Sequence, residues 1–245
     1  MNTLFFGSHD TFAALQAKLS ACVDCDTETS EALLTPKVIG DLAVIPVAGI
    51  IAKRVPSGIQ GVCDLDVLNA NIAKLPFLGV TKCLFWFDTD GGQVQGLFDT
   101  WERINALSNF GITTIAYSDT SMLSAGYVLA SACDVVVAAD DASVGMVGVR
   151  LVVVKTTTND KQEGIDYHVF SYGANKDRQY PHTEWRKEID DPYFESLVKE
   201  VGDRAWSYVT RKRTLAEEVK QADIYSGEKA LAVGLVESVQ RIDPL

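Results

Sequence analysis

The chain has 245 residues, of which 47% are hydrophobic and 22% charged. This composition is typical of a globular protein that buries a core without metals or disulfides. The net charge of −11 opposes binding to phosphate backbones, so nucleic acid is not expected as a partner. Five cysteines, an odd number, do not predict a disulfide framework, and no apolar run reaches membrane-spanning length. We therefore expect a cytoplasmic protein that needs no metal or cofactor.

The first 40 residues differ in pattern from the rest of the chain. Residues 11–23 carry apolar side chains at helical spacing, and Asp10 is placed to cap such a helix. Residues 24–37 are mostly polar and are expected to form a loop. We predict an N-terminal helix and loop over 1–40, followed by a main domain over 41–245.

The main domain begins with a predicted strand over 42–51, in which Pro46 indicates an edge or a bulge. A helix is predicted over 65–75 and ends at Pro76. Residues 80–88 form an almost unbroken apolar run, which is typical of a strand buried on both faces of a parallel sheet.

Beyond this strand, helical and strand patterns alternate. The expected elements are a helix over 94–107, a strand over 112–117, a short helix over 124–132, strands over 134–139, 149–154 and 167–172, a long helix over 194–209, and a last helix capped by Ser226 and ended by Gly234. Such alternation predicts an α/β fold of stacked strand–helix units with a helical C-terminal part.

Two strand ends carry residues suited to acyl transfer. Gly91 and Gly92 follow one strand and can point backbone N–H groups at a developing oxyanion. Ser124 opens a helix after another strand, where the amide of Ala125 can serve as a second donor. Because ligands of open parallel sheets bind beyond the carboxyl ends of the strands, we expect these segments to meet. The alternative is that they are a tight turn and a helix cap.

A serine nucleophile needs a base. His9, His168 and His182 have no evident tie to Ser124 in the sequence. A lysine kept neutral by burial can act instead, and Lys176 follows a glycine turn at a predicted strand end. The alternative for Lys176 is a solvated loop lysine.

These segments resemble the signal peptide peptidase A family, including its bacteriophage branch of head maturation proteases. The matching motifs are Val44-Ile45-Pro46-Val47-Ala48-Gly49, Asp88-Thr89-Asp90-Gly91-Gly92, Met122-Leu123-Ser124-Ala125-Gly126-Tyr127, Gly145-Met146-Val147-Gly148-Val149, Tyr172-Gly173-Ala174-Asn175-Lys176-Asp177 and the run from Tyr225 to Val236. They occur in the family's order, and Lys176 lies 52 residues after Ser124, which matches the family spacing.

The resemblance implies a Clp protease/crotonase-like fold of stacked ββα units and a Ser–Lys dyad. Ser124 would attack the peptide carbonyl, Lys176 would take its proton, and the amides of Gly92 and Ala125 would hold the oxyanion. It also implies a homo-oligomer, since relatives often complete their sites across subunits. Protein or peptide substrates, and capsid or scaffold proteins as partners in a host cytoplasm, follow from the phage branch.

The sequence departs from the family pattern at three places. Asp90 replaces a proline, Met122 and Leu123 replace small residues, and Met146 replaces a serine that helps to orient the lysine in relatives. Candidates for that lost support are Ser143, Ser171 and Tyr172.

Three other functions are compatible with parts of this pattern. A Clp-type protease would need a histidine about 25 residues after the serine, and none occurs near Val149. A crotonase-like acyl-CoA enzyme would need neither Ser124 nor Lys176. A catalytically weak or inactive relative that acts as a scaffold or assembly protein would explain Met146.

Overall fold

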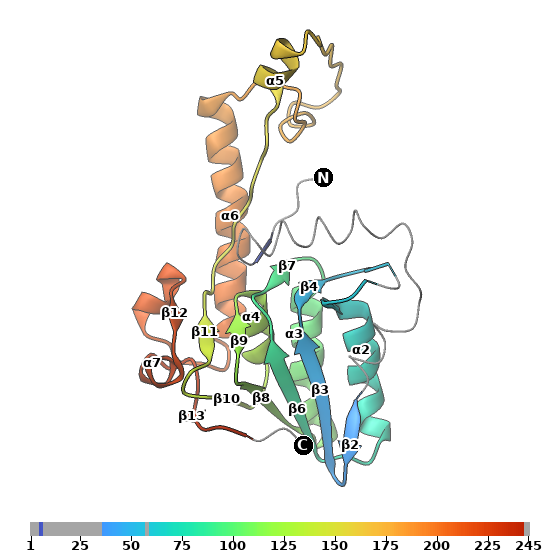
Figure 1. The fold of residues 1–245 in the computed structure, drawn as a ribbon, viewed down its shortest axis with the longest axis vertical. Coiled ribbons are helices and arrows are strands. Elements are labelled where there is room, and N and C mark those ends of the chain that lie inside the picture. The colour runs from blue at the N-terminus through green and yellow to red at the C-terminus, as the bar shows by residue number, and fades with distance from the viewer. Residues whose placement is uncertain (1–4, 7–35, 57–58, 243–245) are drawn as a thin grey trace.

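The structure is a computed structural model, and it describes residues 5–6, 36–56 and 59–242. Its centre is a six-stranded sheet in the order β13-β10-β8-β6-β3-β2 (Figure 1). All neighbours pair in parallel except β2, which pairs antiparallel at one edge. The strands are β2 (Lys37–Ile39), β3 (Leu42–Ala48), β6 (Lys82–Asp88), β8 (Thr113–Ser118), β10 (Val135–Ala138) and β13 (Ser238–Val239).

The predicted strand over 42–51 is divided in two by Gly49. β3 ends at Ala48, and β4 (Ile50–Ala52) joins a different sheet. Gly49 has a φ of +83°, and a Cβ there would lie 2.3 Å from the carbonyl oxygen of Gly61. The prediction for Pro46 is confirmed within the described residues, because β2 pairs with β3 only as far as Val44 and no described strand pairs with Pro46 on that side.

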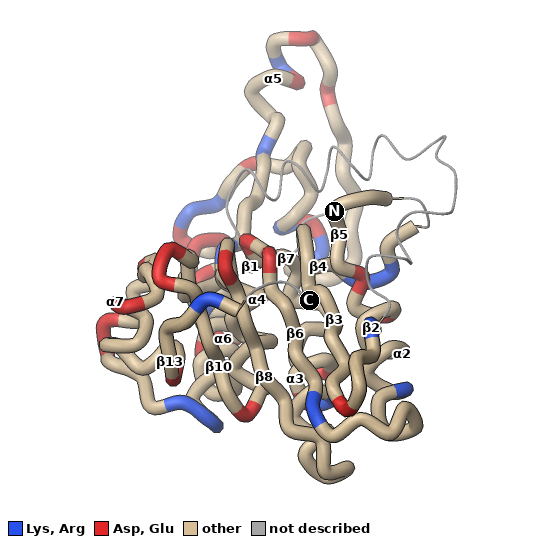
Figure 2. Tube along the Cα trace, turned by 60° about the horizontal axis from the view of Figure 1, so that its bottom comes forward, with Lys and Arg blue, Asp and Glu red and all other residues tan. Residues whose placement is uncertain are grey.

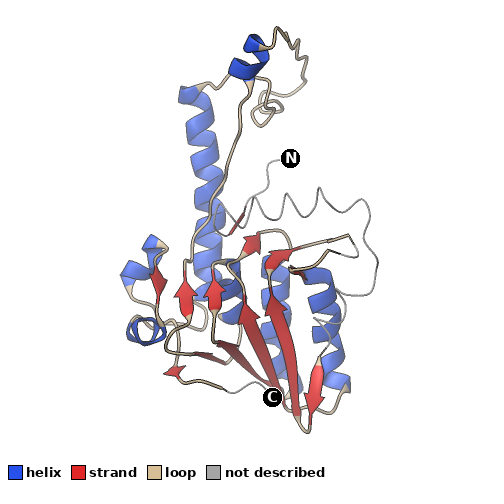
Figure 3. Cartoon of the chain, viewed as in Figure 1, coloured by secondary structure: helices blue, strands red, loops and turns tan. Residues whose placement is uncertain are grey.

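Helices cover one face of the central sheet (Figure 3). They are α2 (Leu65–Lys74), α3 (Leu97–Asn105) and α4 (Ala125–Ala130). Trp101 of α3 is buried among them, and its indole N–H donates to Ser131 Oγ at 3.0 Å. Cys83 and Cys133 are free thiols of this core. On the opposite face, the backbone N–H of Ile242 donates to the hydroxyl of Tyr117 at 3.0 Å and holds the C-terminal segment there.

Two smaller sheets lie beyond the carboxyl ends of the central strands. One has the order β1-β7-β4-β5 and the other β12-β11-β9. Their further strands are β1 (Phe5–Phe6), β5 (Val62–Asp64), β7 (Gly92–Gln93), β9 (Ser121–Leu123), β11 (Ser143–Gly145) and β12 (Ile224–Tyr225). The last helix, α7 (Gly227–Ala232), begins after Ser226 and stops before Gly234, as predicted. The predicted helix over 11–23 lies outside the described residues.

Residues 150–186 and the first half of α6 (Lys187–Val209) form an arm that projects from the sheets (Figure 1). The second half of α6 is anchored, because Ala205 and Val209 are buried in the main core. The short helix α5 (Thr157–Gln162) lies at the far end of the arm. α6 is therefore longer than the predicted helix over 194–209 and begins at the arm's tip.

The predictions of strands over 149–154 and 167–172 are wrong. Residues 151–155 run beside α6, where Leu151 and Phe194 help to line a cavity of about 480 Å³, and residues 167–172 are loop. Among the described residues, 151–155 have no backbone hydrogen bond. Their valines favour a strand, but strand propensity needs a neighbouring strand to be realised. In the second segment the side chain of Tyr172 is fully exposed.

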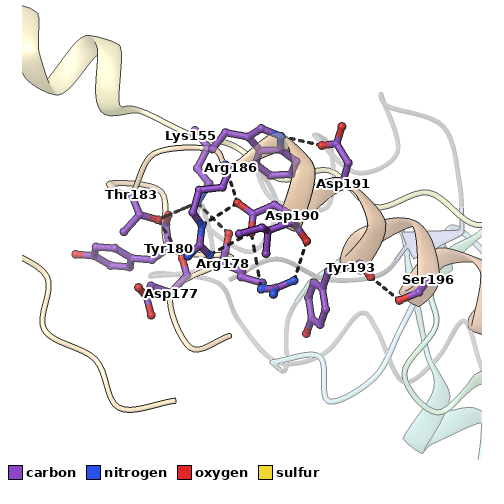
Figure 4. A network of polar contacts seen from close by, with 12 residues as sticks. Lys155, Asp177, Arg178, Tyr180, Thr183, Arg186, Asp190, Asp191, Tyr193 and Ser196 are labelled. Atoms are coloured by element: carbon purple, nitrogen blue, oxygen red, sulfur yellow. Dashed lines mark hydrogen bonds and ion pairs between the residues drawn. The ribbon is translucent and has the colours of Figure 1, made fainter. Parts of the chain in front are cut away.

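The arm is held together by polar contacts (Figure 4). The ammonium of Lys155 donates to the carbonyl oxygens of Arg178 and Tyr180 at 2.9 and 2.8 Å and to Thr183 Oγ1 at 2.9 Å. Burial holds the pKa of Lys155 below its ordinary value. One cation thus ties residue 155 to the segment that leads into α6.

Asp190 is the fully buried charge of the arm. Its carboxylate accepts from the backbone N–H of Arg186 at 2.8 Å and from the guanidinium of Arg186 at 3.1 Å, and Arg178 lies 3.8 Å away. Burial raises the pKa of Asp190, but these donors and charges outweigh it, so the net pKa lies below its ordinary value.

Charges on the rest of the surface are dispersed. In the view of Figure 2, the Lys and Arg positions of the described residues lie among Asp and Glu positions rather than in one basic stripe. Several pair directly, such as Arg103 with Asp99 and Arg241 with Asp141. The expectation that nucleic acid is not a partner stays a prediction.

We predict that the arm loosens at acid pH before the core does. A carboxyl group with a lowered folded-state pKa stabilises the fold above its unfolded pKa of about 3.9, and this contribution is lost as the pH falls through the folded pKa. Asp190→Asn should open the arm already at pH 7, at a cost of roughly 1–3 kcal/mol. Hydrogen exchange of peptides from 155–190, compared with peptides from β6, measures the effect.

Asp203→Asn is the matched control, because Asp203 pairs with Lys199 on an exposed face of the same helix. Equal exchange in the two variants would show that the Asp190 network does not hold the arm.

Candidate active site

Ser124 lies on a strained turn between β9 and α4. Its backbone has φ 55° and ψ −117°, a conformation that residues other than glycine rarely adopt. Its N–H donates to the carbonyl oxygen of Gly145 at 2.8 Å, which fixes the turn against β11. The side chain makes no capping hydrogen bond to α4, so the alternative of a simple helix cap is not supported. Strain of this kind at a polar residue is characteristic of functional sites.

The turn that carries Gly91 and Gly92 is joined to the Ser124 segment through Thr89. The N–H of Thr89 donates to the carbonyl oxygen of Ser121 at 2.9 Å, and its carbonyl accepts from the N–H of Leu123 at 3.0 Å. The two segments expected to meet therefore do so.

The side chain of Thr89 also shapes the glycine turn. Its hydroxyl donates to the carbonyl oxygen of Gly49 at 2.6 Å and accepts from the N–H of Gly91 at 3.1 Å. The sequence pattern alone does not predict this role of Thr89. The available signal was a hydroxyl residue two positions before Gly91, which is the spacing of a side-chain turn.

Close approaches of neighbouring atoms require glycine at two positions of the site. A Cβ at Gly92 would lie 1.9 Å from the carbonyl oxygen of Ile51. A Cβ at Gly126 would lie 2.4 Å from Cγ2 of Thr89. The glycine turn therefore contacts β4 directly through its backbone, and the start of α4 packs against the side chain of Thr89.

The two predicted oxyanion donors are backbone amides on either side of this contact. Ala125 is the first residue of α4, so its N–H is among those that the helix leaves without an intrahelical partner. The carbonyl of Gly91 accepts from the N–H of Ile51 at 2.9 Å and so faces β4. Because successive residues of a strand face opposite edges, the amide of Gly92 faces away from β4.

Lys176 is not brought to Ser124 within one chain. It lies in the arm segment that joins α5 to α6. Figure 1 shows this segment near the end of α6 that is remote from the sheets. Its side chain is exposed, and its backbone N–H donates to the carbonyl oxygen of Gly173 at 3.1 Å. Ser171 is exposed on the same loop, whereas Ser143 begins β11 opposite Ser121 of β9.

The residues that depart from the family pattern take different positions. Asp90 is exposed, and Met122 is buried in the main core. Met146 directly follows Gly145, whose carbonyl holds Ser124, and has a φ of +52°. Its N–H donates to the carbonyl oxygen of Asp223 at 2.8 Å. A methionine thus stands beside the Ser124 turn where relatives are expected to carry a serine.

The two histidines of the described residues, His168 and His182, also lie on the arm. His182 Nδ1 is 2.8 Å from Asp160 Oδ2, and its ring stacks on Tyr167 with centroids 3.9 Å apart. His168 is exposed, and Lys155 is fixed by the carbonyl groups described above. His9 lies outside the described residues.

A family comparison agrees with this geometry. Residues 107–245, more than half of the chain, match the model of peptidase family S49. The chain belongs to peptidase family S49. The resemblance to the signal peptide peptidase A family is thereby confirmed.

Among curated proteins, the head–tail preconnector protein GP5 of Enterobacteria phage P21 is 26% identical over 223 residues. The match covers 83% of this chain and 41% of GP5, so the chain spans about two-fifths of the length of that relative.

Every helix of the described residues is too short or too polar to cross a lipid bilayer.

One solved structure confirms the predicted fold, and a second is reported for comparison. Methylmalonyl-CoA decarboxylase complexed with 2S-carboxypropyl-CoA has a TM-score of 0.50 and 12% identity, covering 85% of this chain and 68% of that one. The membrane-bound stomatin-specific protease 1510-N in complex with a substrate peptide has a TM-score of 0.40 and 17% identity, covering 80% and 77%. The likeness to the decarboxylase shows the crotonase-like fold alone and is not evidence for acyl-CoA chemistry.

We predict that Gly126→Ala separates the glycine turn from α4. The new methyl group would collide with Cγ2 of Thr89, at a cost of roughly 1–3 kcal/mol in the free energy of unfolding. Chemical denaturation measures this loss. Thr89→Ser removes Cγ2 and keeps the hydroxyl, so the double variant should regain most of the stability.

Gly202→Ala is the matched control, because a Cβ at Gly202 in α6 has no neighbour within 4 Å. This variant should be neutral or stabilised. An equal loss in both alanine variants would contradict the contact between Gly126 and Thr89.

Proposed function

We propose that the protein is a serine endopeptidase in which Ser124 is the nucleophile and the amides of Gly92 and Ala125 hold the oxyanion. The observation that carries this proposal is the strained turn at Ser124, tied by Thr89 to the glycine turn that presents Gly92. Preorganised amides near a nucleophile stabilise the charge that develops in acyl transfer. On this view, residues 41–245 act as the peptidase domain.

We propose further that the base is Lys176 of a neighbouring copy. Lys176 is exposed on the arm, far along α6 from the Ser124 turn of its own chain. Phe170 and Tyr172 beside it expose 93% and 100% of their surface. An apolar tip of this kind favours burial against another subunit, and burial favours the neutral amine that a base requires.

The chemistry then follows from the groups present. The Lys176 amine takes the proton of Ser124 as Oγ attacks the peptide carbonyl carbon, and the amides of Gly92 and Ala125 bind the oxyanion. The C–N bond breaks as the ammonium returns the proton to the leaving amine. Water, activated by the same amine, hydrolyses the resulting ester.

The substrate class is protein or peptide, and the phage relative supports a capsid assembly role. GP5 carries the name head–tail preconnector protein and aligns over 83% of this chain. We therefore propose capsid or scaffold proteins as partners and a host cytoplasm as the location. Ser143 and Ser171 are proposed to support the lysine, one from each side of the subunit contact.

Met146 favours a second candidate function, that of a non-catalytic assembly protein. A thioether cannot accept a strong hydrogen bond from an amine or ammonium, so it cannot orient the lysine as a serine would. The homologue's name, which describes a structural role, is compatible with this alternative.

We predict that Ser124→Ala and Lys176→Ala each lower cleavage of labelled casein by about 10³-fold or more. Mixing and refolding the two variants together should restore activity, because a lysine from one variant can serve the serine of the other. At equal amounts and random assembly, about a quarter of the sites contain both groups.

Lys161→Ala, which removes an exposed arm lysine paired with Glu184, is the control and should retain activity. If the mixture does not recover cleavage activity, the base belongs to the same chain as Ser124. A wild type that cleaves neither casein nor itself would favour the assembly role.

A further inference from the structure

The N-terminal strand β1 lies along the glycine turn of the candidate site. Phe5 and Phe6 pair antiparallel with β7, with Phe6 opposite Gly92 and Phe5 opposite Gln93. β1 is the edge strand of its sheet, and it lies between β7 and α6 (Figure 1). The chain thus places a segment of its own backbone against the residue proposed to hold the oxyanion.

The register of this pairing determines which carbonyl of β1 lies opposite the amide of Gly92. The amide of Gly92 faces away from β4 and therefore toward the edge that β1 occupies. Where the amides of two directly opposite residues in an antiparallel pair face each other, each residue donates its N–H to the carbonyl oxygen of the other. The carbonyl of Phe6 is consequently the group set opposite the Gly92 amide, where a scissile carbonyl would have to lie.

The nucleophile is closed off in the same arrangement. Ser124 exposes only 1% of its surface. A substrate carbonyl therefore cannot reach the hydroxyl unless part of the covering structure moves. β1 is suited to move, because it contributes only two residue pairs, and so short an edge strand is weakly held.

We propose that β1 occupies the groove in which an extended peptide substrate adds as an antiparallel strand to β7, so that the chain is inhibited by its own N-terminal segment. This inference rests on the proposed function and names its binding mode, recognition of a peptide backbone by strand addition. A substrate must displace β1, and tethering within the chain gives β1 a high effective concentration.

A disulfide between the two strands tests the proposal in the full chain. Phe5 and Gln93 form the non-hydrogen-bonded pair next to Phe6 and Gly92, and such pairs have Cα atoms about 4.5 Å apart, within reach of a disulfide. The variant Phe5→Cys with Gln93→Cys is made in a background with Cys22→Ser and Cys25→Ser. The remaining native cysteines are buried.

The oxidised variant is expected to lose about two mass units by disulfide formation and to cleave labelled casein about tenfold or more slowly, with activity regained on reduction. Phe5→Cys with Gln95→Cys is the matched control, because Gln95 lies two residues further along the chain. That control should cross-link poorly and keep its activity in oxidant.

The outcomes separate this inference from the proposed function. Failure of Phe5→Cys/Gln93→Cys to cross-link, or equal activity of its oxidised and reduced forms, would overturn the inference. If the wild type cleaves nothing, the proposed function fails. The groove is then tested separately, by binding of a labelled peptide with the sequence of residues 1–8. It should bind the reduced variant and not the oxidised one, and equal binding to both forms would reject the groove.

Discussion

The hydrogen bonds of Thr89 are the constraint on which the site depends. Its backbone joins the end of β6 to β9, and its hydroxyl reaches both Gly49 and Gly91. One residue therefore fixes the Ser124 turn, the glycine turn and the start of β4 relative to one another. A strained backbone such as that of Ser124 stores on the order of 1–3 kcal/mol and persists only where its surroundings fix it on several sides.

The body and the arm are stabilised by different forces. The body buries a continuous apolar core in which Phe85, Tyr127 and Trp101 are almost completely covered. The arm has few buried apolar groups, and its order rests on Lys155, Asp190 and their partners. Polar networks of this kind are directional, so they fix a shape that a small apolar core would leave loose, but they fail when a single charge is neutralised.

Much of the body could be predicted from sequence because its patterns report local burial. The apolar run of β6 and the stripe of α3 predicted both elements correctly. The arm could not be predicted, since valine-rich residues 151–155 have strand propensity but no strand partner among the described residues. The spacing between Ser124 and Lys176 also carries no information on which copy supplies the lysine. Thr89 was missed because its role depends on Gly49, forty residues away.

The length of α6 has a mechanical consequence. With 23 residues at about 1.5 Å each, the helix is a lever of roughly 35 Å between its buried base and the arm's tip. A tilt of about 5° at the base displaces the tip by roughly 3 Å, which is the length of a hydrogen bond. Any group carried at the outer end of the helix moves with the angle of its base, so the packing of Ala205 and Val209 sets the position of a segment that lies far from them.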